Sequence, residues 1–254
     1  MPVSPSMPEE KDELTCDAFL GGRLHLRQPA RGFRAGIDSV LLAASVPAKA
    51  GDRILELGAG AGVAALCLAA RVEGVHIEGI ERERSLVVLA RENAAANDLA
   101  VRVTFHEGDA TRPPAKSEAF DHVMMNPPYN DPAKGTPAPH RGKRKALAEC
   151  DAALTAWIAH ARDALKPGGR LTLVFRADRA SLLWPLLRDG FGATAMLPLF
   201  PDRQRPARRI LVAAAKGGTF DLHFAASLTL HAAASKYTPE ADALLRGAAS
   251  LDWN

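Results

Sequence analysis

Short apolar segments alternate with helix-like segments along most of this chain of 254 residues. Strand-like segments lie at 53–59, 76–81, 101–109, 120–126 and 170–176. Helix-like segments, among them 84–98 and 153–169, lie between strands. When strands alternate with helices, the strands pair in parallel and the helices cover both faces of the sheet. The pattern therefore predicts an α/β fold.

The alternation ends in the last third of the chain. The segment 178–190 is helix-like, although Pro185 conflicts with a helix interior. Two strand-like segments, 193–200 and 208–218, follow without a helix between them, so we expect an antiparallel pair. Two adjacent glycines within 18–29 signal a short β-hairpin. We expect a Rossmann-like, seven-stranded, mostly parallel sheet with helices on both faces, an antiparallel last strand pair and a hairpin before it.

A chain of this length suits one large domain. The first 17 residues are rich in proline and charge, and we expect them to be a disordered tail. We interpret the remainder, 18–254, as a single domain. Its parts are a hairpin and helix at 18–50, a core at 51–218 and a C-terminal extension at 219–254.

Composition excludes several classes of protein. The formal net charge is only +3, and Cys16, Cys67 and Cys150 are too far apart for a redox motif or a metal knuckle. The eight histidines form no metal-ligand pattern, so we expect no metal. Because no apolar run is long enough to span a bilayer and no secretory signal is present, we expect a cytoplasmic protein without a membrane partner. We also expect a monomer.

A glycine-rich turn follows the first strand of the core. "LELGAGAG" places glycines at 58, 60 and 62, where backbone can approach a ligand and a helix N-terminus presents free N–H groups. Glu81 ends the next strand, where a carboxylate can accept hydrogen bonds from both hydroxyls of a ribose. Asp109 ends the third strand and can bind an adenine amino group. A generic strand-to-helix turn is the alternative, and the spacing is not that of a dehydrogenase fingerprint.

The fourth strand runs into "NPPY" at 126–129. Two prolines cannot donate backbone hydrogen bonds and end the strand. A plain turn is one interpretation, and a rigid binding surface is the other. His122, Trp157 and Trp184 lie in strand-like or helix-like segments, and we expect all three to pack in the core.

"LELGAGAG", "GIERE", "EGDA", "NPPY" and "LKPGGRL" together resemble the class I S-adenosylmethionine-dependent methyltransferases, in order and in spacing. The resemblance implies S-adenosylmethionine as cofactor. The donor-binding residues that we expect are Arg34, Gly36, Asp38, Glu56, Gly58, Ala59, Gly60, Gly62, Glu81, Arg82, Asp109, Ala110 and Asn126. The catalytic residues that we expect are Asn126, Pro127, Pro128 and Tyr129.

The "NPPY" chemistry suits a planar nitrogen with a delocalised lone pair. The Asn126 carboxamide and the Pro127 carbonyl can each accept one N–H of such a nitrogen, which aims its lone pair at the methyl group. Tyr129 offers a face on which a base can stack. The adenine amine and the glutamine amide are both candidate acceptors.

Residues 26–44, 207–218 and 228–247 resemble the tRNA (adenine-N6)-methyltransferases that modify a valine tRNA. This resemblance implies a tRNA substrate. Ile37 departs from the usual threonine of that subfamily, and Asn130 stands where a larger hydrophobic or aromatic residue is common. The alternatives are a glutamine-N5 methyltransferase of release factors and a non-catalytic RNA-binding protein on the same fold.

A basic segment at 131–145 follows the "NPPY" motif directly. Its five basic residues outnumber one acid, and its prolines and glycines disfavour regular structure. We expect these side chains to contact phosphates of the substrate RNA: Lys134, Arg141, Lys143, Arg144 and Lys145. Four arginines near the last strands, at 203, 205, 208 and 209, are expected to form a solvated rim.

Overall fold

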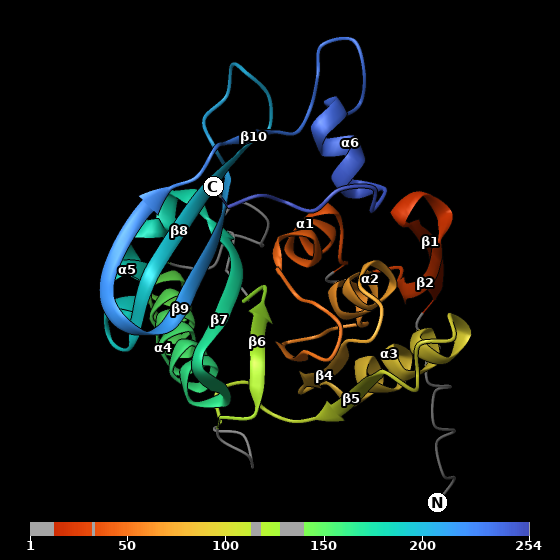
Figure 1. The fold of residues 1–254 in the computed structure, drawn as a ribbon, viewed down its shortest axis with the longest axis horizontal. Helices are drawn as coiled ribbons and strands as arrows, with labels where there is room; N and C mark the ends of the chain where they lie inside the picture. Colours follow the sequence, from red (N-terminus) through yellow and green to blue (C-terminus); the bar gives the residue numbers. More distant parts are fainter. Residues whose placement is uncertain (1–12, 32–33, 113–117, 128–139, 254) are drawn as a thin grey trace, which may run out of the picture.

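The computed structural model describes residues 13–31, 34–112, 118–127 and 140–253 (Figure 1). Its centre is a sheet of eight strands in the order β10-β8-β9-β7-β6-β3-β4-β5. These strands are β3 (Arg53–Leu57), β4 (His76–Glu81), β5 (Val103–Glu107), β6 (Phe120–Met125), β7 (Leu165–Arg176), β8 (Phe191–Phe200), β9 (Arg209–Phe224) and β10 (Leu228–Thr229). A separate antiparallel hairpin consists of β1 (Leu14–Phe19) and β2 (Leu24–Pro29).

The order and direction of the strands confirm the expected architecture. Strands β7, β6, β3, β4 and β5 pair in parallel, and β9 is antiparallel to both β7 and β8. The eighth strand, β10, was not predicted. It has only two residues, paired in parallel with β8, and two residues are too few to show the alternation of apolar and polar residues typical of a strand. It extends the sheet with residues of the C-terminal extension.

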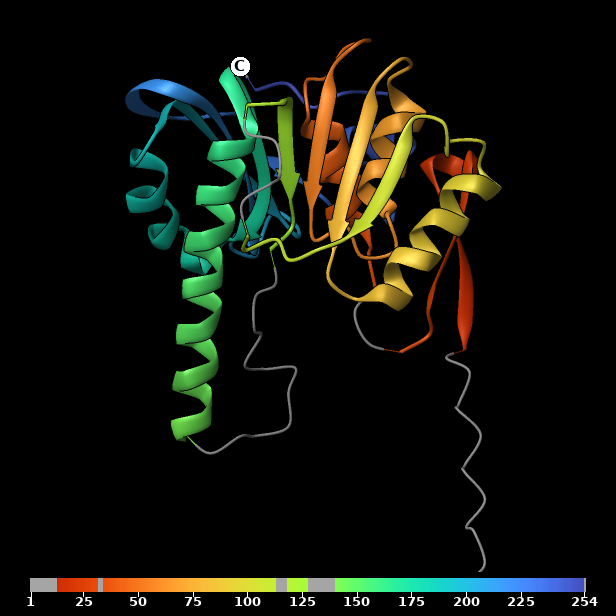
Figure 2. The same ribbon diagram turned by 90° about the horizontal axis from the view of Figure 1, so that it is seen from below.

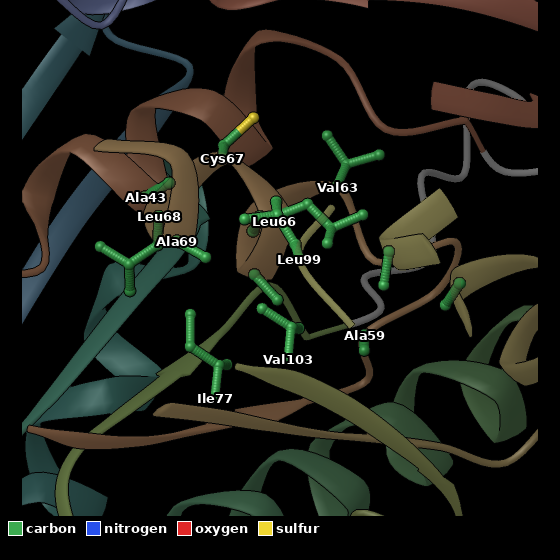
Figure 3. Close-up of a cluster of buried hydrophobic side chains, with 14 of the residues drawn as sticks. Ala43, Ala59, Val63, Leu66, Cys67, Leu68, Ala69, Ile77, Leu99 and Val103 are labelled. Carbon is green, nitrogen blue, oxygen red and sulfur yellow. The ribbon is translucent and has the colours of Figure 1, made fainter. Parts of the chain in front are cut away.

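Helices cover both faces of the sheet, and each face has its own apolar core (Figures 1 and 2). The helices are α1 (Ile37–Ser45), α2 (Val63–Arg71), α3 (Arg84–Ala96), α4 (His140–Ala164), α5 (Leu183–Arg188) and α6 (Pro239–Leu245), with 3-10 turns η1 (Leu20–Gly22) and η2 (Ala177–Leu182). On one face α2 buries Val63, Leu66 and Leu68 against Ile77 and Val103 of the sheet (Figure 3). On the other face α4 and α5 pack over β6, β7 and β9. None of the helices in the described ranges is long and apolar enough to cross a membrane.

Helix α4 differs from its prediction at both ends. It begins at His140, well before 153, because Ala, Lys, Arg, Glu and Leu dominate the intervening residues and all favour a helix. It ends at Ala164, and Pro167 falls in the following strand β7, which begins at Leu165. The helix thus ends before Pro167-Gly168-Gly169, the residues expected to stop it, and these three residues lie in β7.

The other departures are local. Pro185 lies in the first turn of α5, where backbone N–H groups have no partner within the helix, so its conflict disappears. The strand β1 starts at Leu14, and residues 14–17, which we expected in the disordered tail, pair with β2. Residues 1–12 of that tail lie outside the described residues.

Candidate active site

Three glycines form the turn between β3 and α2, and all have positive φ angles: 71° at Gly58, 56° at Gly60 and 85° at Gly62. Only glycine adopts such angles without strain. A Cβ atom at Gly58 would lie 2.5 Å from the Trp157 ring, and one at Gly62 would lie 2.6 Å from the Phe105 ring. At Gly60 a Cβ atom would meet nothing within 4 Å. Gly60 is thus the glycine that faces open space, as a ligand-contacting glycine must.

The end of β4 holds this turn in place. The Glu81 carboxylate accepts hydrogen bonds from the Gly60 N–H (2.9 Å) and the Glu83 N–H (3.0 Å). The Ile80 carbonyl accepts from the N–H groups of Gly58 and Ala59, at 2.8 and 3.0 Å. A carboxylate has about four acceptor positions, so Glu81 retains capacity for the hydroxyls of a ribose.

The carboxyl ends of β4 and β5 lie side by side, so the two expected carboxylates, Glu81 and Asp109, lie at the same end of the sheet. The Glu81 carbonyl accepts from the Gly108 N–H at 3.0 Å. Asp109 then accepts from the backbone N–H (2.8 Å) and the hydroxyl (2.7 Å) of Thr111, and these bonds lower the pKa of Asp109. The charges of Arg112 and Arg82 lower this pKa further.

Ala110 is buried behind Asp109, and its carbonyl accepts a hydrogen bond from Nδ1 of His160 in α4 at 2.9 Å. Burial lowers the pKa of His160. Helix α4 therefore packs against the glycine turn, where the Trp157 ring lies next to Gly58, and against the segment after β5, where His160 contacts Ala110. Trp157 is buried, as predicted, and Trp184 is partly buried against the same core.

Asn126 directly follows β6, at the same carboxyl end of the sheet as the glycine turn. Leu57 of β3 and Met125 of β6 are register partners, so Gly58 and Asn126 leave their strands at the same level. The Oδ1 atom of Asn126 is buried and has no hydrogen-bond partner in the described part of the chain. An unpaired buried acceptor costs roughly 1–3 kcal/mol, which an N–H group of a ligand would recover. Pro127 is buried beside it, whereas Pro128, Tyr129 and Asn130 lie outside the described residues.

Glu56 lies beneath the glycine turn, with 4% of its surface exposed. Its carboxylate accepts a hydrogen bond from the Ala65 N–H in the first turn of α2 at 3.0 Å. Burial raises the pKa of Glu56 to about 8; the Ala65 bond opposes this shift and the charge of Glu81 adds to it. Glu56 therefore supports the turn from below, and its contact with a donor stays a prediction.

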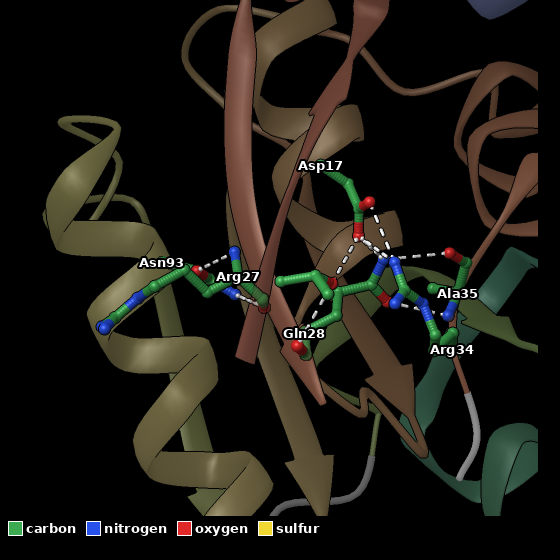
Figure 4. A network of polar contacts seen from close by, with 7 residues as sticks. Asp17, Arg27, Gln28, Arg34, Ala35 and Asn93 are labelled. Carbon is green, nitrogen blue, oxygen red and sulfur yellow. Dashed lines mark hydrogen bonds and ion pairs between the residues drawn. The ribbon is translucent and has the colours of Figure 1, made fainter. Parts of the chain in front are cut away.

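The residues expected from the N-terminal segment are tied to other elements. Arg34 forms an ion pair with Asp17 of β1 at 2.7 Å, and Gln28 links Asp17 to the backbone of Ala35 (Figure 4). Gly36 is the N-cap of α1. Asp38, in the first turn of α1, accepts a hydrogen bond from Arg209 of β9 at 3.2 Å. These contacts hold the segment that leads into α1 and the first turn of that helix. Contact of Arg34, Gly36 and Asp38 with S-adenosylmethionine stays a prediction.

Sequence reasoning missed Asn93, which is 1% exposed in α3. Its amide donates to the Ala61 carbonyl in the glycine turn at 3.0 Å and exchanges two bonds with the Arg27 backbone in β2 (Figure 4). Asn93 thus joins the hairpin to the glycine turn. The available signal was an amide on the apolar face of a helix, between Ala90 and Ala94.

The basic residues are placed partly in α4. Lys134 lies outside the described residues, whereas Arg141, Lys143, Arg144 and Lys145 belong to the first turns of α4. The expectation of irregular structure is therefore wrong from His140 onward. Figure 2 shows that this end of α4 (green) projects beyond the carboxyl ends of the strands, on the side of the glycine turn. Within the described ranges, no group of three or more metal-ligating side chains is present.

A family model described as the methyltransferase small domain matches residues 34–197. The chain belongs to this family. The match covers both the glycine turn and Asn126, so the site described above lies within the matched methyltransferase small domain.

Proteins named tRNA1(Val) (adenine(37)-N6)-methyltransferase are similar in sequence. The one from Salmonella arizonae is 33% identical over 56% of this chain and 58% of its own length. The one from Porphyromonas gingivalis is 32% identical over 65% of this chain and 68% of its own length. The match to the Salmonella protein thus spans less than two thirds of that relative.

Two solved structures show the same fold. A protein from Agrobacterium tumefaciens described as a predicted O-methyltransferase is 29% identical, with a TM-score of 0.71 over 84% of this chain and 98% of its own. The 16S rRNA N2 G1207 methyltransferase of T. thermophilus, in complex with AdoMet and guanosine, is 21% identical, with a TM-score of 0.59 over 81% of this chain and 50% of its own.

Proposed function

We propose that this methyltransferase small domain protein transfers a methyl group from S-adenosylmethionine to the exocyclic N6 amine of an adenine in tRNA. The observation that carries the proposal is the buried, unpaired Oδ1 atom of Asn126 beside the glycine turn. Relatives named as tRNA adenine-N6 methyltransferases support the choice of acceptor. With a tRNA substrate, we also propose that the protein acts in the cytoplasm.

The residues of the turn suit this donor. Gly60 leaves open space for a ligand, and Glu81, which already orients the Gly60 N–H, has acceptor positions left for a ribose. Asp109 at the neighbouring strand end can accept from an adenine amino group. When bound, S-adenosylmethionine supplies an electrophilic methyl group. A related fold has been solved with AdoMet bound, which agrees with this assignment.

The chain's own groups prepare the acceptor nitrogen. Asn126 Oδ1 and the Pro127 carbonyl each accept one N–H of the amine, so that the nitrogen becomes pyramidal and its lone pair points at the methyl group. Tyr129 provides the stacking face for the base. A strong general base is unnecessary, because the methylated nitrogen becomes acidic and loses its proton readily.

The basic end of α4 supports the choice of an RNA substrate. The end of α4 that projects beyond the carboxyl ends of the strands (Figure 2) contains Arg141, Lys143, Arg144 and Lys145. Asn126 follows the carboxyl end of β6. Cations at that position can neutralise phosphates on either side of a base that has swung out of its stack. A protein acceptor would depend less on such charges.

The test is transfer of labelled methyl groups from S-adenosylmethionine to two acceptors, an unmodified tRNA pool and a release factor. We expect label in tRNA, recovered as N6-methyladenosine after digestion to nucleosides, and no label in the release factor. Asn126→Ala serves as the control that removes the chemistry. Label in a glutamine of the release factor, or in a hydroxyl group of the RNA, would contradict the proposal.

A further inference from the structure

A cleft lies at the amino ends of β3, β6 and β7, at the opposite end of the strands from the glycine turn. Its volume is about 440 Å³, and we call it the amino-edge cleft. The residues that line it and carry charge or a titratable group are Lys49, Asp52, Asp121, His122, Lys166 and Arg170. They precede β3 or lie at the starts of β6 and β7, whereas the glycine turn follows the end of β3. The methyl-transfer site uses none of them.

His122 is the unusual member of this cleft. Its side chain is 9% exposed, and its Nε2 lies 3.1 Å from Oδ2 of Asp52. Because a carboxylate only accepts, Nε2 carries the proton, and Nδ1 is left buried without a hydrogen-bond partner among the described residues. His122 lines the cleft, but neighbouring atoms cover its Nδ1 in the free protein, so a ligand in the cleft reaches this unpaired nitrogen only after a small shift of the ring or its neighbours.

The acids of the cleft are already paired. Asp52 accepts from His122 and from the Lys49 N–H at 2.9 Å. Asp121 accepts from Lys166 Nζ at 2.7 Å and from the Arg53 N–H at 2.9 Å. Both carboxylates line the cleft, but each already accepts hydrogen bonds from two donors of the protein.

Two of the cations have no such partner. The exposed side chains of Lys49 and Arg170 contact no acid in the ranges that the structure describes. Lys49, Lys166 and Arg170 outnumber Asp52 and Asp121, so the cleft has a net positive charge even with His122 neutral. Gly168 adds open backbone, since a Cβ atom there would meet nothing within 4 Å.

We propose that the amino-edge cleft binds a phosphate group, held by Lys49, Arg170 and the Nδ1–H of a protonated His122. These donors come from three separate segments, the loop before β3 and the strands β6 and β7, so together they can approach an oxyanion from several sides. His122 takes up one proton from solvent when the anion binds, and the ring then donates from both nitrogens, to Asp52 and to the ligand. Burial lowers the pKa of free His122, as does the charge of Arg170, while Asp52 and Asp121 raise it.

The binding test uses the full chain with inorganic phosphate and with sulfate as probes in titration calorimetry. We expect saturable binding of both anions. Arg170→Ala should weaken it about tenfold, the loss expected for one charged hydrogen bond. Arg203→Ala, which removes an exposed arginine outside the cleft, is the matched control and should change nothing. Absence of saturable binding, or equal affinities of the Arg170→Ala variant and the wild type, would overturn the proposal.

The protonation step has its own readout. Sulfate does not titrate near neutral pH, so its binding heat in two buffers of different ionisation enthalpy reports proton uptake by the protein. We expect uptake near pH 8 in the wild type and none in His122→Gln. Uptake that persists in a folded His122→Gln variant would remove His122 from the site. Because no methyl acceptor takes part, this result is independent of the proposed methyl transfer.

A final comparison distinguishes the source of the phosphate. A short RNA without terminal phosphates is added to the phosphate-loaded protein. If RNA displaces phosphate from the wild type and Arg170→Ala reduces this competition, the cleft binds phosphates of the RNA backbone. If phosphate stays bound, the cleft takes a free phosphate or a nucleotide.

Discussion

The glycines of the turn after β3 have similar backbone angles but different surroundings. A side chain at Gly58 or Gly62 would strike an aromatic ring, whereas one at Gly60 would stand in open space. Substitution at Gly60 can therefore separate ligand binding from packing. Gly51 is the matched control, because its φ of +88° is also positive and its surroundings are also open.

We expect Gly60→Ala and Gly51→Ala each to lower the free energy of unfolding by about 1–2 kcal/mol, the cost of a left-handed backbone for alanine. Only Gly60→Ala should also weaken S-adenosylmethionine binding, by about tenfold or more, or roughly 1.4 kcal/mol. Chemical denaturation and calorimetry measure the two effects. Equal donor affinity in both variants would show that the donor does not lie over Gly60.

Asn126 illustrates a residue kept for chemistry at a cost in stability. Its Oδ1 atom is buried and unpaired among the described residues, which destabilises the free protein. We expect Asn126→Ala to lower kcat by about 10²–10³, the loss typical of one preorganised polar group. Its thermal unfolding midpoint should not fall. A clear loss of stability would indicate that the amide has a structural partner instead.

At the scale of elements, the sequence predicted the sheet because each buried strand of a parallel sheet is a short continuous apolar segment. Such a segment can be recognised without knowing which strands it pairs with. Helix boundaries were harder. The basic first turns of α4 were expected to be irregular because of the prolines and glycines in the segment 131–145, although most residues from His140 onward favour a helix. The strand β10 depends on pairing with β8, which sequence period does not record.

Helix α4 carries the prediction at this scale. Replacing Arg141, Lys143, Arg144 and Lys145 with glutamine should raise the Michaelis constant for tRNA and flatten the salt dependence of binding. The slope should fall by about 0.7–0.9 for each phosphate contact that is lost. Donor affinity should be unchanged, because the glycine turn is untouched. The control, Arg203→Gln with Arg208→Gln, should leave the slope as it is; a quadruple variant with the wild-type slope would mean that these charges face solvent.

For the molecule as a whole, the site is held together by contacts between segments that are distant in sequence. The glycine turn and the "NPPY" motif were visible from sequence, since their residue types are local signals. The tertiary contacts of the turn were not visible from sequence, because each joins two elements that are distant in the chain. They are the packing of Trp157 against Gly58 and the hydrogen bonds of Glu81 with Gly60 and of Asn93 with Ala61.

The buried carboxyl of Glu56 couples this arrangement to pH. Its pKa is about 8 in the folded protein and near 4.5 when solvated, so the folded state holds the extra proton between these values. The contribution of Glu56 to stability is therefore present below about pH 4.5 and is lost as pH rises through about 8. We expect Glu56→Gln to gain stability relative to the wild type as pH rises from 5 to 9. Parallel curves of unfolding free energy against pH would show that Glu56 ionises freely.

The central claim is methylation of an adenine at N6 in tRNA. The most direct measurement compares two transcripts of a valine tRNA, one with adenosine at position 37, the position in the relatives' name, and one with guanosine there. With labelled S-adenosylmethionine, we predict N6-methyladenosine in the first transcript and no incorporation in the second. Equal labelling of both transcripts, or a methylated nucleoside other than N6-methyladenosine, would contradict the account.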